Sequence, residues 1–332
     1  MTLALPALAP ALVPSLPTHE RWFVESREAG DWSFFLSPLP LALTAAVVVV
    51  TVLWRVVALR VDRPELPVLR PLARLVPWVP RLLGIHLGVA LLALAATGAF
   101  ITPSNDHLEG AGGSALLLVE AALGIWLVTG WQLRTAAALV LGLAPALALV
   151  AGWTALGECA NLAAVAAFLV VVPPGPDAYG AAHPSRAHLR WALLWLRLGV
   201  GVALVVLAFS EKLTNPAMAI DTLERYPALD VFALVGLDVS PETFVAVAGA
   251  TELLFGLLVI SGAFPQVAVL VAMVPFNATL LLFGQTEMVG HLPVYGVFLA
   301  LLVYGSSEET YGAVRWLPDR SPRRSVVPAP VA

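Results

Sequence analysis

The segment LALTAAVVVVTVLW (Leu41–Trp54) is one uninterrupted run without a charged residue, and it decides the class of fold. Strands of membrane barrels alternate apolar and polar side chains over about ten residues, and this run does not. Across the 332 residues, 59% are hydrophobic and 12% are charged, about half the charged share of a soluble domain. Runs of this kind approach the roughly 20 apolar residues that cross a bilayer core. The sequence therefore predicts an all-α, polytopic membrane protein.

Similar runs recur along the chain and predict about nine transmembrane helices. The predicted spans are 39–60, 81–101, 114–130, 135–152, 157–172, 189–210, 243–262, 266–284 and 287–305. They divide the chain into an extracytoplasmic segment, a first helix with a basic cytoplasmic loop, two four-helix units joined by a cytoplasmic linker, and a cytoplasmic tail. The corresponding ranges are 1–38, 39–80, 81–173, 174–188, 189–305 and 306–332. Residues 1–38 hold either a signal peptide or an interfacial segment.

The distribution of arginine predicts the orientation. Arginine is concentrated in the loop after the first span, around residues 186–190 and in the tail after residue 305. The loops on the opposite side are acidic, and their acidic residues are Asp106, Glu109, Asp221, Glu224, Asp230 and Asp238. Basic loops remain in the cytoplasm. We therefore expect the amino terminus outside and the carboxyl terminus inside a bacterial plasma membrane.

The two units resemble each other in sequence. VEAALGIWLVTG (Val119–Gly130) aligns with TELLFGLLVISG (Thr251–Gly262), and GVAL at Gly88–Leu91 aligns with GVAL at Gly201–Leu204. This self-similarity predicts a tandem duplication of a four-helix unit. Because an even number of spans preserves orientation, the copies should be parallel and related by a pseudo-twofold axis along the membrane normal. The first span lies outside the repeat.

Three segments of the second unit carry a resemblance to a known family. They are AFSEKLTNP (Ala208–Pro216), ELLFGLLVISG (Glu252–Gly262) and GHLPVYG (Gly290–Gly296). In these segments the unit resembles the DoxX family of four-helix bacterial membrane proteins. The resemblance implies a redox-linked context, because members are associated with quinone-linked sulfur oxidation or with oxidative-stress complexes. It supplies no catalytic motif that can be carried over residue by residue.

Polar residues inside membrane spans usually face the bundle interior and mark a site. Glu287, His291 and Tyr295 follow at i, i+4 and i+8 and so form one stripe. We expect His291 to face a polar cluster in the outer half of the membrane, with a carboxylate or Asn277 as its partner. The candidate pocket consists of Glu211, Lys212, Glu252, Asn277, Glu287, His291 and Tyr295. The first unit is poorer in polar groups, and its secondary candidates are Glu120, Glu158 and Asn161.

Structural interpretations of the same residues remain open. Glu211 and Lys212 are equally compatible with an interfacial snorkelling pair, and Gln285 and Glu287 with headgroup-level residues. Tyr295 could belong to an aromatic belt. Glu252 could have a structural hydrogen-bonding role. The glycines that match between the units are typical of close helix packing, and they are Gly124, Gly130, Gly256 and Gly262.

Two classes of function compete. In the first, the pocket binds a quinone, and the chain is a membrane subunit of an oxidoreductase that receives electrons from a partner protein. In the second, it is a solute or proton carrier, or a chaperone or assembly scaffold. Membrane lipid is an expected partner in either case, and nucleic acid is not.

We expect no metal site and no intrinsic haem. Cys159 is the one cysteine, so the chain alone cannot build a thiolate metal site. His86 is expected to bond a neighbour in its own helix. The predicted depths of His86 and His291 differ by roughly 15–20 Å, too far for two ligands of one haem iron.

Overall fold

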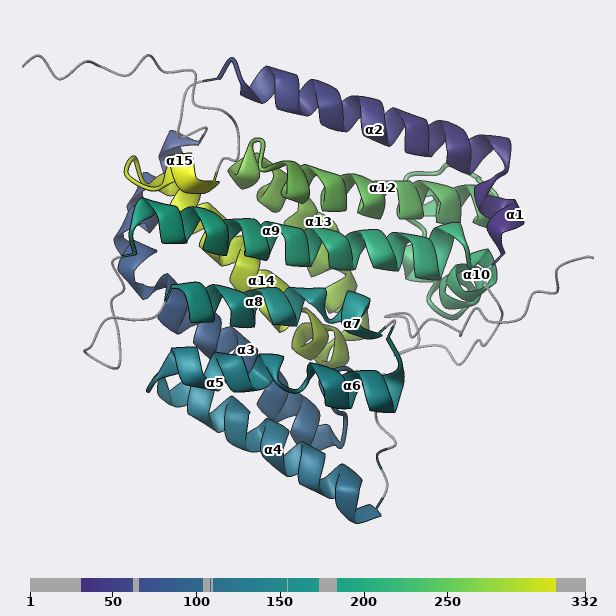
Figure 1. Ribbon diagram of the computed structural model, residues 1–332. Coiled ribbons are helices and arrows are strands. Elements are labelled where there is room, and N and C mark those ends of the chain that lie inside the picture. The colour runs from purple at the N-terminus through teal and green to yellow at the C-terminus, as the bar shows by residue number, and fades with distance from the viewer. Residues whose placement is uncertain are drawn as a thin grey trace, which may run out of the picture.

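The computed structural model describes residues 31–61, 66–103, 108, 110–153, 155–172 and 184–314. The regular elements of these residues are all helices (Figure 1). The expectations for residues 1–30, for the linker 174–183, for Asp106 and Glu109, and for the tail 315–332 lie outside the described residues.

Eight helical segments are long and apolar enough to cross a membrane, and the prediction of an all-helical, multi-pass membrane protein is confirmed to that extent. The segments are Pro38–Ala58, Pro67–Thr97, Gly110–Thr129, Leu133–Ala151, Arg186–Leu213, Pro241–Ser261, Pro265–Phe283 and Glu287–Ser306. The remaining predicted span, the fifth (157–172), corresponds to α7 (Ala155–Glu158) and α8 (Ala160–Val171). Because α8 has 12 residues, it is only about 18 Å long.

The segment between the first two spans is helical, whereas the sequence predicted a loop there. The 3-10 helix η2 (Pro67–Trp78) leads directly into α3 (Val79–Thr97). Leu69, Leu72 and Leu75 pack against the core. A 3-10 helix has three residues per turn, so leucines spaced by three share one face. Prolines inside η2 also disfavour a regular α-helix there, because they lack the amide proton that its i→i−4 hydrogen bonds require.

Two further spans depart from a single regular helix. The fourth is α5 (Leu133–Leu141) followed by α6 (Ala144–Ala151), broken just before Pro145, whose nitrogen cannot donate to an α-helical ladder. The sixth is α9 (Arg186–Leu207), which continues into a π-helical turn, η3 (Ala208–Leu213). The remaining elements are α1 (Trp32–Phe35), α2 (Pro38–Ala58), α4 (Gly110–Thr129), α10 (Pro216–Arg225), η4 (Pro227–Leu229), α11 (Val231–Leu234), α12 (Pro241–Ser261), α13 (Pro265–Phe283), α14 (Gln285–Ser306) and α15 (Tyr311–Val314).

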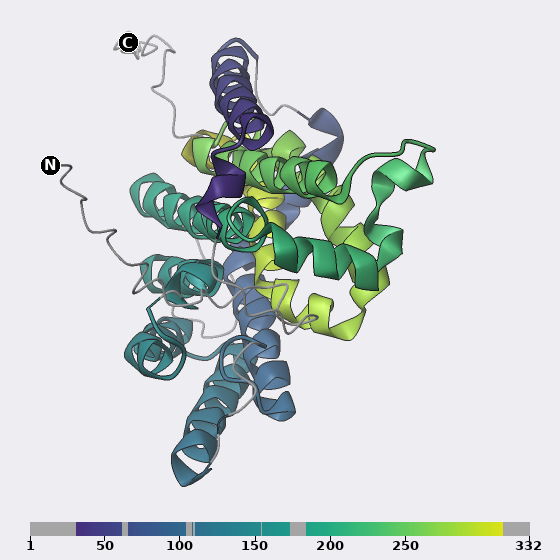
Figure 2. The same ribbon diagram turned by 90° about the vertical axis from the view of Figure 1, so that its right-hand side faces the viewer.

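The long helices pack into two groups. In each group every helix contacts the next, and the last contacts the first. The first group is α3, α4, α5 and α8, and the second is α9, α12, α13 and α14. Between the groups, α8 packs on α9 and α14 packs on α3. Helix α2 packs on α12, outside both groups. Figure 2 looks along this arrangement from the end that carries α1 and α10, and α15 lies at the opposite end (Figure 1). We call these the α10 end and the α15 end.

A pair of glycines sets the closest crossing in each group. A Cβ atom built on Gly124 would lie 2.8 Å from the carbonyl oxygen of Gly88, where α4 crosses α3. A Cβ atom built on Gly256 would lie 2.9 Å from the carbonyl oxygen of Gly201, where α12 crosses α9. Only residues without a side chain let two membrane helices approach so closely. The close-packing interpretation of Gly124 and Gly256 is therefore confirmed.

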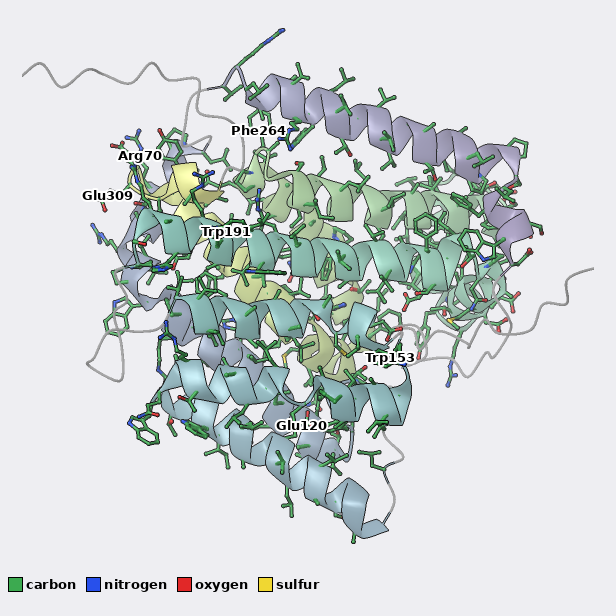
Figure 3. The ribbon with its side chains drawn as sticks, viewed as in Figure 1. Arg70, Glu120, Trp153, Trp191, Phe264 and Glu309 are labelled. Atoms are coloured by element: carbon green, nitrogen blue, oxygen red, sulfur yellow. The ribbon has the colours of Figure 1, made fainter. Side chains whose placement is uncertain are left out.

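The turn after α4 has the same backbone form as the turn after α12. Gly130 and Gly262 have φ of 81° and 63°, and two residues further on Gln132 and Phe264 both have φ of 44°. The left-handed region costs a glycine little. An arginine also lies against each glycine, and Arg81 on Gly130 donates to the carbonyl oxygen of Leu127 at 3.2 Å. Phe264 marks the second turn in Figure 3.

Exposed tryptophans lie towards both ends of the helices. Trp153 is 80% exposed and Trp191 is 60% exposed. Figure 3 shows Trp153 towards the α10 end and Trp191 towards the α15 end. Tryptophan favours the two membrane–water interfaces, so this placement agrees with helices that run across the bilayer.

Candidate functional site

The π-helical turn η3 places two charged residues inside the protein. The amide of Thr214 donates to the carbonyl oxygen of Phe209 at 2.9 Å, a bond five residues apart that closes the turn. Such turns occur often at functional sites. The side chain of Glu211 is fully buried and that of Lys212 is 17% exposed. The interpretation of this pair as outward snorkelling residues is therefore wrong.

Lys212 lies between two carboxylates. Its Nζ is 3.3 Å from Oε2 of Glu211 and 3.2 Å from Oε2 of Glu252 on α12. An isolated charge in a membrane interior is costly, and a partner of opposite charge lowers that cost. The cation therefore stabilises both carboxylates and connects η3 to the middle of α12.

A second pair of ionisable residues lies on α14. Nδ1 of His291 is 3.2 Å from Oε1 of Glu287, one helical turn earlier. Glu287 is 1% exposed, so its side chain lies inside the protein and not on its surface. The ring of Phe276 on α13 meets the His291 ring edge-on, with centroids 4.7 Å apart. The predicted partner of His291 is thus a carboxylate and not Asn277.

Asn277 and Tyr295 lie apart from these charges and bond each other. The Tyr295 hydroxyl donates to Oδ1 of Asn277 at 3.3 Å, and Nδ2 of Asn277 donates to the carbonyl oxygen of Met273 at 2.7 Å. Asn277 is exposed, and neither residue lines the cavity described next. Two of the seven predicted pocket residues thus form a separate pair beyond the ring of Phe276.

Four of the ionisable residues line a cavity of about 370 Å³, and Glu211 does not. Its polar wall includes Lys212, Glu252, Glu287 and His291, and most of the remaining wall is apolar. A volume of this size suits a small-molecule ligand. Five phenylalanines contribute to the lining, and they are Phe232, Phe244, Phe255, Phe276 and Phe283.

A lid formed by α10, η4 and α11 covers the cavity at the α10 end, and all three elements contribute lining residues. The Tyr226 ring on the lid meets Phe283 of α13 edge-on at 4.8 Å between centroids, and Phe232 meets Phe244 of α12 at 6.2 Å. This lid was not predicted from the sequence. The sequence feature that could have indicated the lid is the loop between the first two spans of the second unit, which is longer than the corresponding loop of the first unit.

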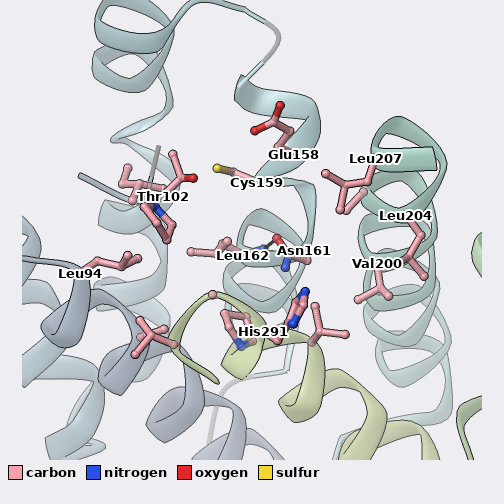
Figure 4. A pocket seen from close by; sticks show the side chains of 18 of the residues that line it. Leu94, Thr102, Glu158, Cys159, Asn161, Leu162, Val200, Leu204, Leu207 and His291 are labelled. Carbon is pink, nitrogen blue, oxygen red and sulfur yellow. Dashed lines mark hydrogen bonds between the residues drawn. The ribbon is translucent and has the colours of Figure 1, made fainter. Parts of the chain in front are cut away.

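A smaller pocket of about 50 Å³ lies between the two groups of helices (Figure 4). Thr102, Glu158 and Asn161 come to it from the first group and His291 from the second. His291 is the one polar residue that lines both this pocket and the large cavity. The structure thus brings two secondary candidates, Glu158 and Asn161, to the same histidine.

Glu120 lies elsewhere, although its sequence position corresponds to that of Glu252. Oε1 of Glu120 accepts the amide of Ile101 at 3.0 Å, and the residue is fully buried (Figure 3). It lines neither pocket. The aligned glutamates therefore have different surroundings, a backbone amide in one case and a lysine in the other.

His86 on α3 and His291 on α14 lie closer together than their sequence positions predicted. Nδ1 of His86 lies 2.8 Å from the carbonyl oxygen of Leu82, which confirms the expected helix neighbour. A Cβ built on Gly296 would lie 3.0 Å from Cβ of His86. Gly296 and His291 are five residues apart on α14, or about 7.5 Å along the helix, so the predicted gap of 15–20 Å is too large. The described ranges contain no group of three or more His, Cys, Asp or Glu residues suited to a metal ion.

Comparisons of the chain with family models, with curated proteins and with solved structures found no match.

Proposed function

We propose that this membrane protein binds a lipid-soluble amphipathic molecule of the quinone type in the cavity beneath the lid. The observation that carries the proposal is the cavity itself, about 370 Å³ of mostly apolar space whose wall also holds four ionisable residues. The tail and ring of a quinone match the apolar wall. The polar residues of the wall can form hydrogen bonds with its head group, and Glu252 and Glu287 can exchange protons with it.

In this proposal the chain is a membrane subunit of an oxidoreductase, and a partner protein exchanges electrons with the bound quinone. The resemblance to DoxX in Ala208–Pro216 and Gly290–Gly296 favours this class. These segments supply Lys212 and His291, the two cationic or hydrogen-bond-donating residues of the cavity. Their position supports the proposal independently of the family.

We also propose that the chain is a tandem duplication of a DoxX-like unit. The matching glycine crossings and the matching turns at Gly130 and Gly262 support it. So do the reciprocal contacts between units, α8 with α9 and α3 with α14, which a pseudo-twofold axis requires. The cavity and the lid belong to the second unit, so the second unit binds the ligand and the first acts as its scaffold.

The alternative of a proton carrier draws on one observation, the position of His291 between two pockets. A histidine that faces two hydrated spaces can pass a proton between them. Proton flux into liposomes that contain the purified protein, lost in His291→Gln, would favour a carrier over a quinone-binding subunit.

Retention of quinone tests the first proposal. The protein is isolated from its native membrane in a mild detergent, and the lipid extract is assayed for quinone. We expect about one quinone per chain. Ala248→Phe, which fills the cavity wall, should abolish retention, and Ala45→Phe on the exposed face of α2 should not. Equal retention by both variants, or none in the unaltered protein, would exclude the cavity as a quinone site.

A further inference from the structure

The threonines of the cavity use their hydroxyl protons within their own helices. Thr251 donates to the carbonyl oxygen of Val247 at 2.8 Å, and Thr279 donates to that of Phe276 at 3.1 Å. Both residues line the cavity. A hydroxyl has one proton and two lone pairs. Each of these threonines can therefore offer the cavity lone pairs, which accept hydrogen bonds, but not its proton.

The ionisable residues that line the cavity also include several hydrogen-bond acceptors. An ionised carboxylate only accepts hydrogen bonds, and Glu252 and Glu287 both line the cavity. The Lys212 ammonium points at Glu211 and Glu252, and Nδ1 of His291 points at Glu287. Two carboxylates therefore line the cavity together with one lysine and one histidine, and a third carboxylate, Glu211, contacts Lys212 without lining the cavity. Because the two donors already point at carboxylates, the wall favours ligand groups that donate hydrogen bonds and disfavours negative charge.

The aromatic part of the lining acts in the same direction. The faces of phenyl rings carry a partial negative charge, and five phenylalanines belong to the wall. An anionic head group would meet two carboxylates and, wherever a ring turns its face to the cavity, further negative charge. A neutral or cationic head group that carries N–H or O–H bonds meets complementary partners throughout.

From this inventory we infer that the cavity selects a head group that donates hydrogen bonds. The inference rests on the proposed function, and for a quinone-type ligand it means that the reduced hydroquinone binds more tightly than the oxidised quinone. The two forms have the same ring and the same tail. They differ in that the hydroquinone carries two O–H donors, whereas the quinone carries only acceptor oxygens.

Selective binding of the reduced form changes the redox equilibrium of the bound ligand. The quinone takes up two electrons and two protons to become the hydroquinone. Because the reduced state is stabilised, the midpoint potential of the bound couple rises by about 30 mV for each tenfold preference. In a redox titration, mediators supply the electrons and the buffer supplies the protons.

Binding of decylubiquinol and decylubiquinone to the purified full-length protein tests the inference. We expect the quinol to bind at least about tenfold more tightly. The carbonyl oxygens of the quinone would face acceptor atoms of the wall, so neither side would form a hydrogen bond, and unsatisfied buried acceptors are costly. Glu252→Gln and Glu287→Gln place amide donors in the wall and should reduce the preference. Glu120→Gln is the matched control, since Glu120 lines neither pocket, and it should leave the preference unchanged.

The outcomes separate this inference from the proposed function. If both forms bind, if Ala248→Phe prevents their binding, and if the quinone binds as tightly as the quinol, the cavity function stands and the donor selection is wrong. If neither form binds, or if Ala248→Phe leaves the binding of both forms unchanged, the proposed function fails and the inference fails with it. Displacement of the quinol by dodecylamine supports the donor rule, and displacement by dodecanoate contradicts it.

Discussion

The ammonium of Lys212 lies 3.2 Å from the carboxylate of Glu252, and this contact joins the π-helical end of one membrane helix to the middle of another. Glu211 approaches the same ammonium from η3. The contact therefore has two consequences. It neutralises charge inside the membrane region, and it fixes the side of η3 that borders the cavity.

Lys212→Met should destabilise the protein, because it removes the cation from between two carboxylates that then repel each other. A loss of about 3–5 kcal/mol is expected when one partner of a largely buried ion pair is removed. Thermal unfolding in detergent measures it. Lys212→Met combined with Glu252→Gln should be less destabilised than Lys212→Met alone, since one of the repelling charges is gone. An additive double variant would show that Lys212 and Glu252 are not coupled.

Glu252→Gln should impair ligand binding more than Glu120→Gln at equal expression. Glu252 borders the cavity beside Lys212, whereas Glu120 accepts the amide of Ile101 in a buried position that an amide oxygen can also fill. We expect a loss of binding of about tenfold or more for Glu252→Gln and little change for Glu120→Gln. Binding of radiolabelled decylubiquinol measures both. Equal losses would instead indicate a shared structural role for the aligned glutamates.

The helices and the main cavity residues could be predicted from sequence for a simple reason. Lipid imposes a nearly uniform apolar run on each span, so residues such as Glu252 and His291 that interrupt a run are conspicuous. The same reasoning could not separate Asn277 and Tyr295 from the charged group. Both residues also interrupt apolar runs, and only the packing of Phe276 between them and His291 sets them apart.

Two features could not be predicted from the sequence. One is the contact between Lys212 and Glu252, and the other is the lid. The π turn depends on a backbone bond between Thr214 and Phe209, and no residue type signals such a bond. The lid consists of short helices whose stability comes from contacts such as Tyr226 on Phe283. Those contacts join residues far apart in the chain, and their partners cannot be inferred from local propensity.

Reporter fusions should place the α10 end outside the cell and the α15 end in the cytoplasm, because arginine is concentrated in the segments at the α15 end. Fusions within Ser104–Gly113 and after Gly305 should give opposite signals. A fusion at residue 178 tests whether the short helix α8 crosses the membrane, and it should match the fusion after Gly305. A cytoplasmic signal from Ser104–Gly113 would reverse the orientation.

The purified protein should show no stoichiometric Soret band. Although His86 and His291 are nearer than their sequence positions suggested, His86 packs against the backbone of Gly296, which leaves no room for a porphyrin between α3 and α14. Haem ligation by two histidines requires both rings to face one iron. An absorption spectrum checks the prediction. A Soret band that disappears in His291→Ala would contradict both this packing and the quinone-type ligand.

Gly256→Ala should destabilise the protein, whereas Gly112→Ala should not. A Cβ on Gly256 would lie 2.9 Å from the carbonyl oxygen of Gly201, so α9 and α12 would have to separate. The cost of such overpacking is about 1–3 kcal/mol, more than the roughly 1 kcal/mol that alanine gains over glycine inside a helix. Gly112 lies in α4 with open space around its Cβ position, and only the gain applies there. Thermal unfolding of the two variants should therefore shift in opposite directions. Because α9 and α12 also border the cavity, Gly256→Ala should weaken quinol binding as well, and an unchanged affinity would show that the helix crossing does not set the cavity's shape.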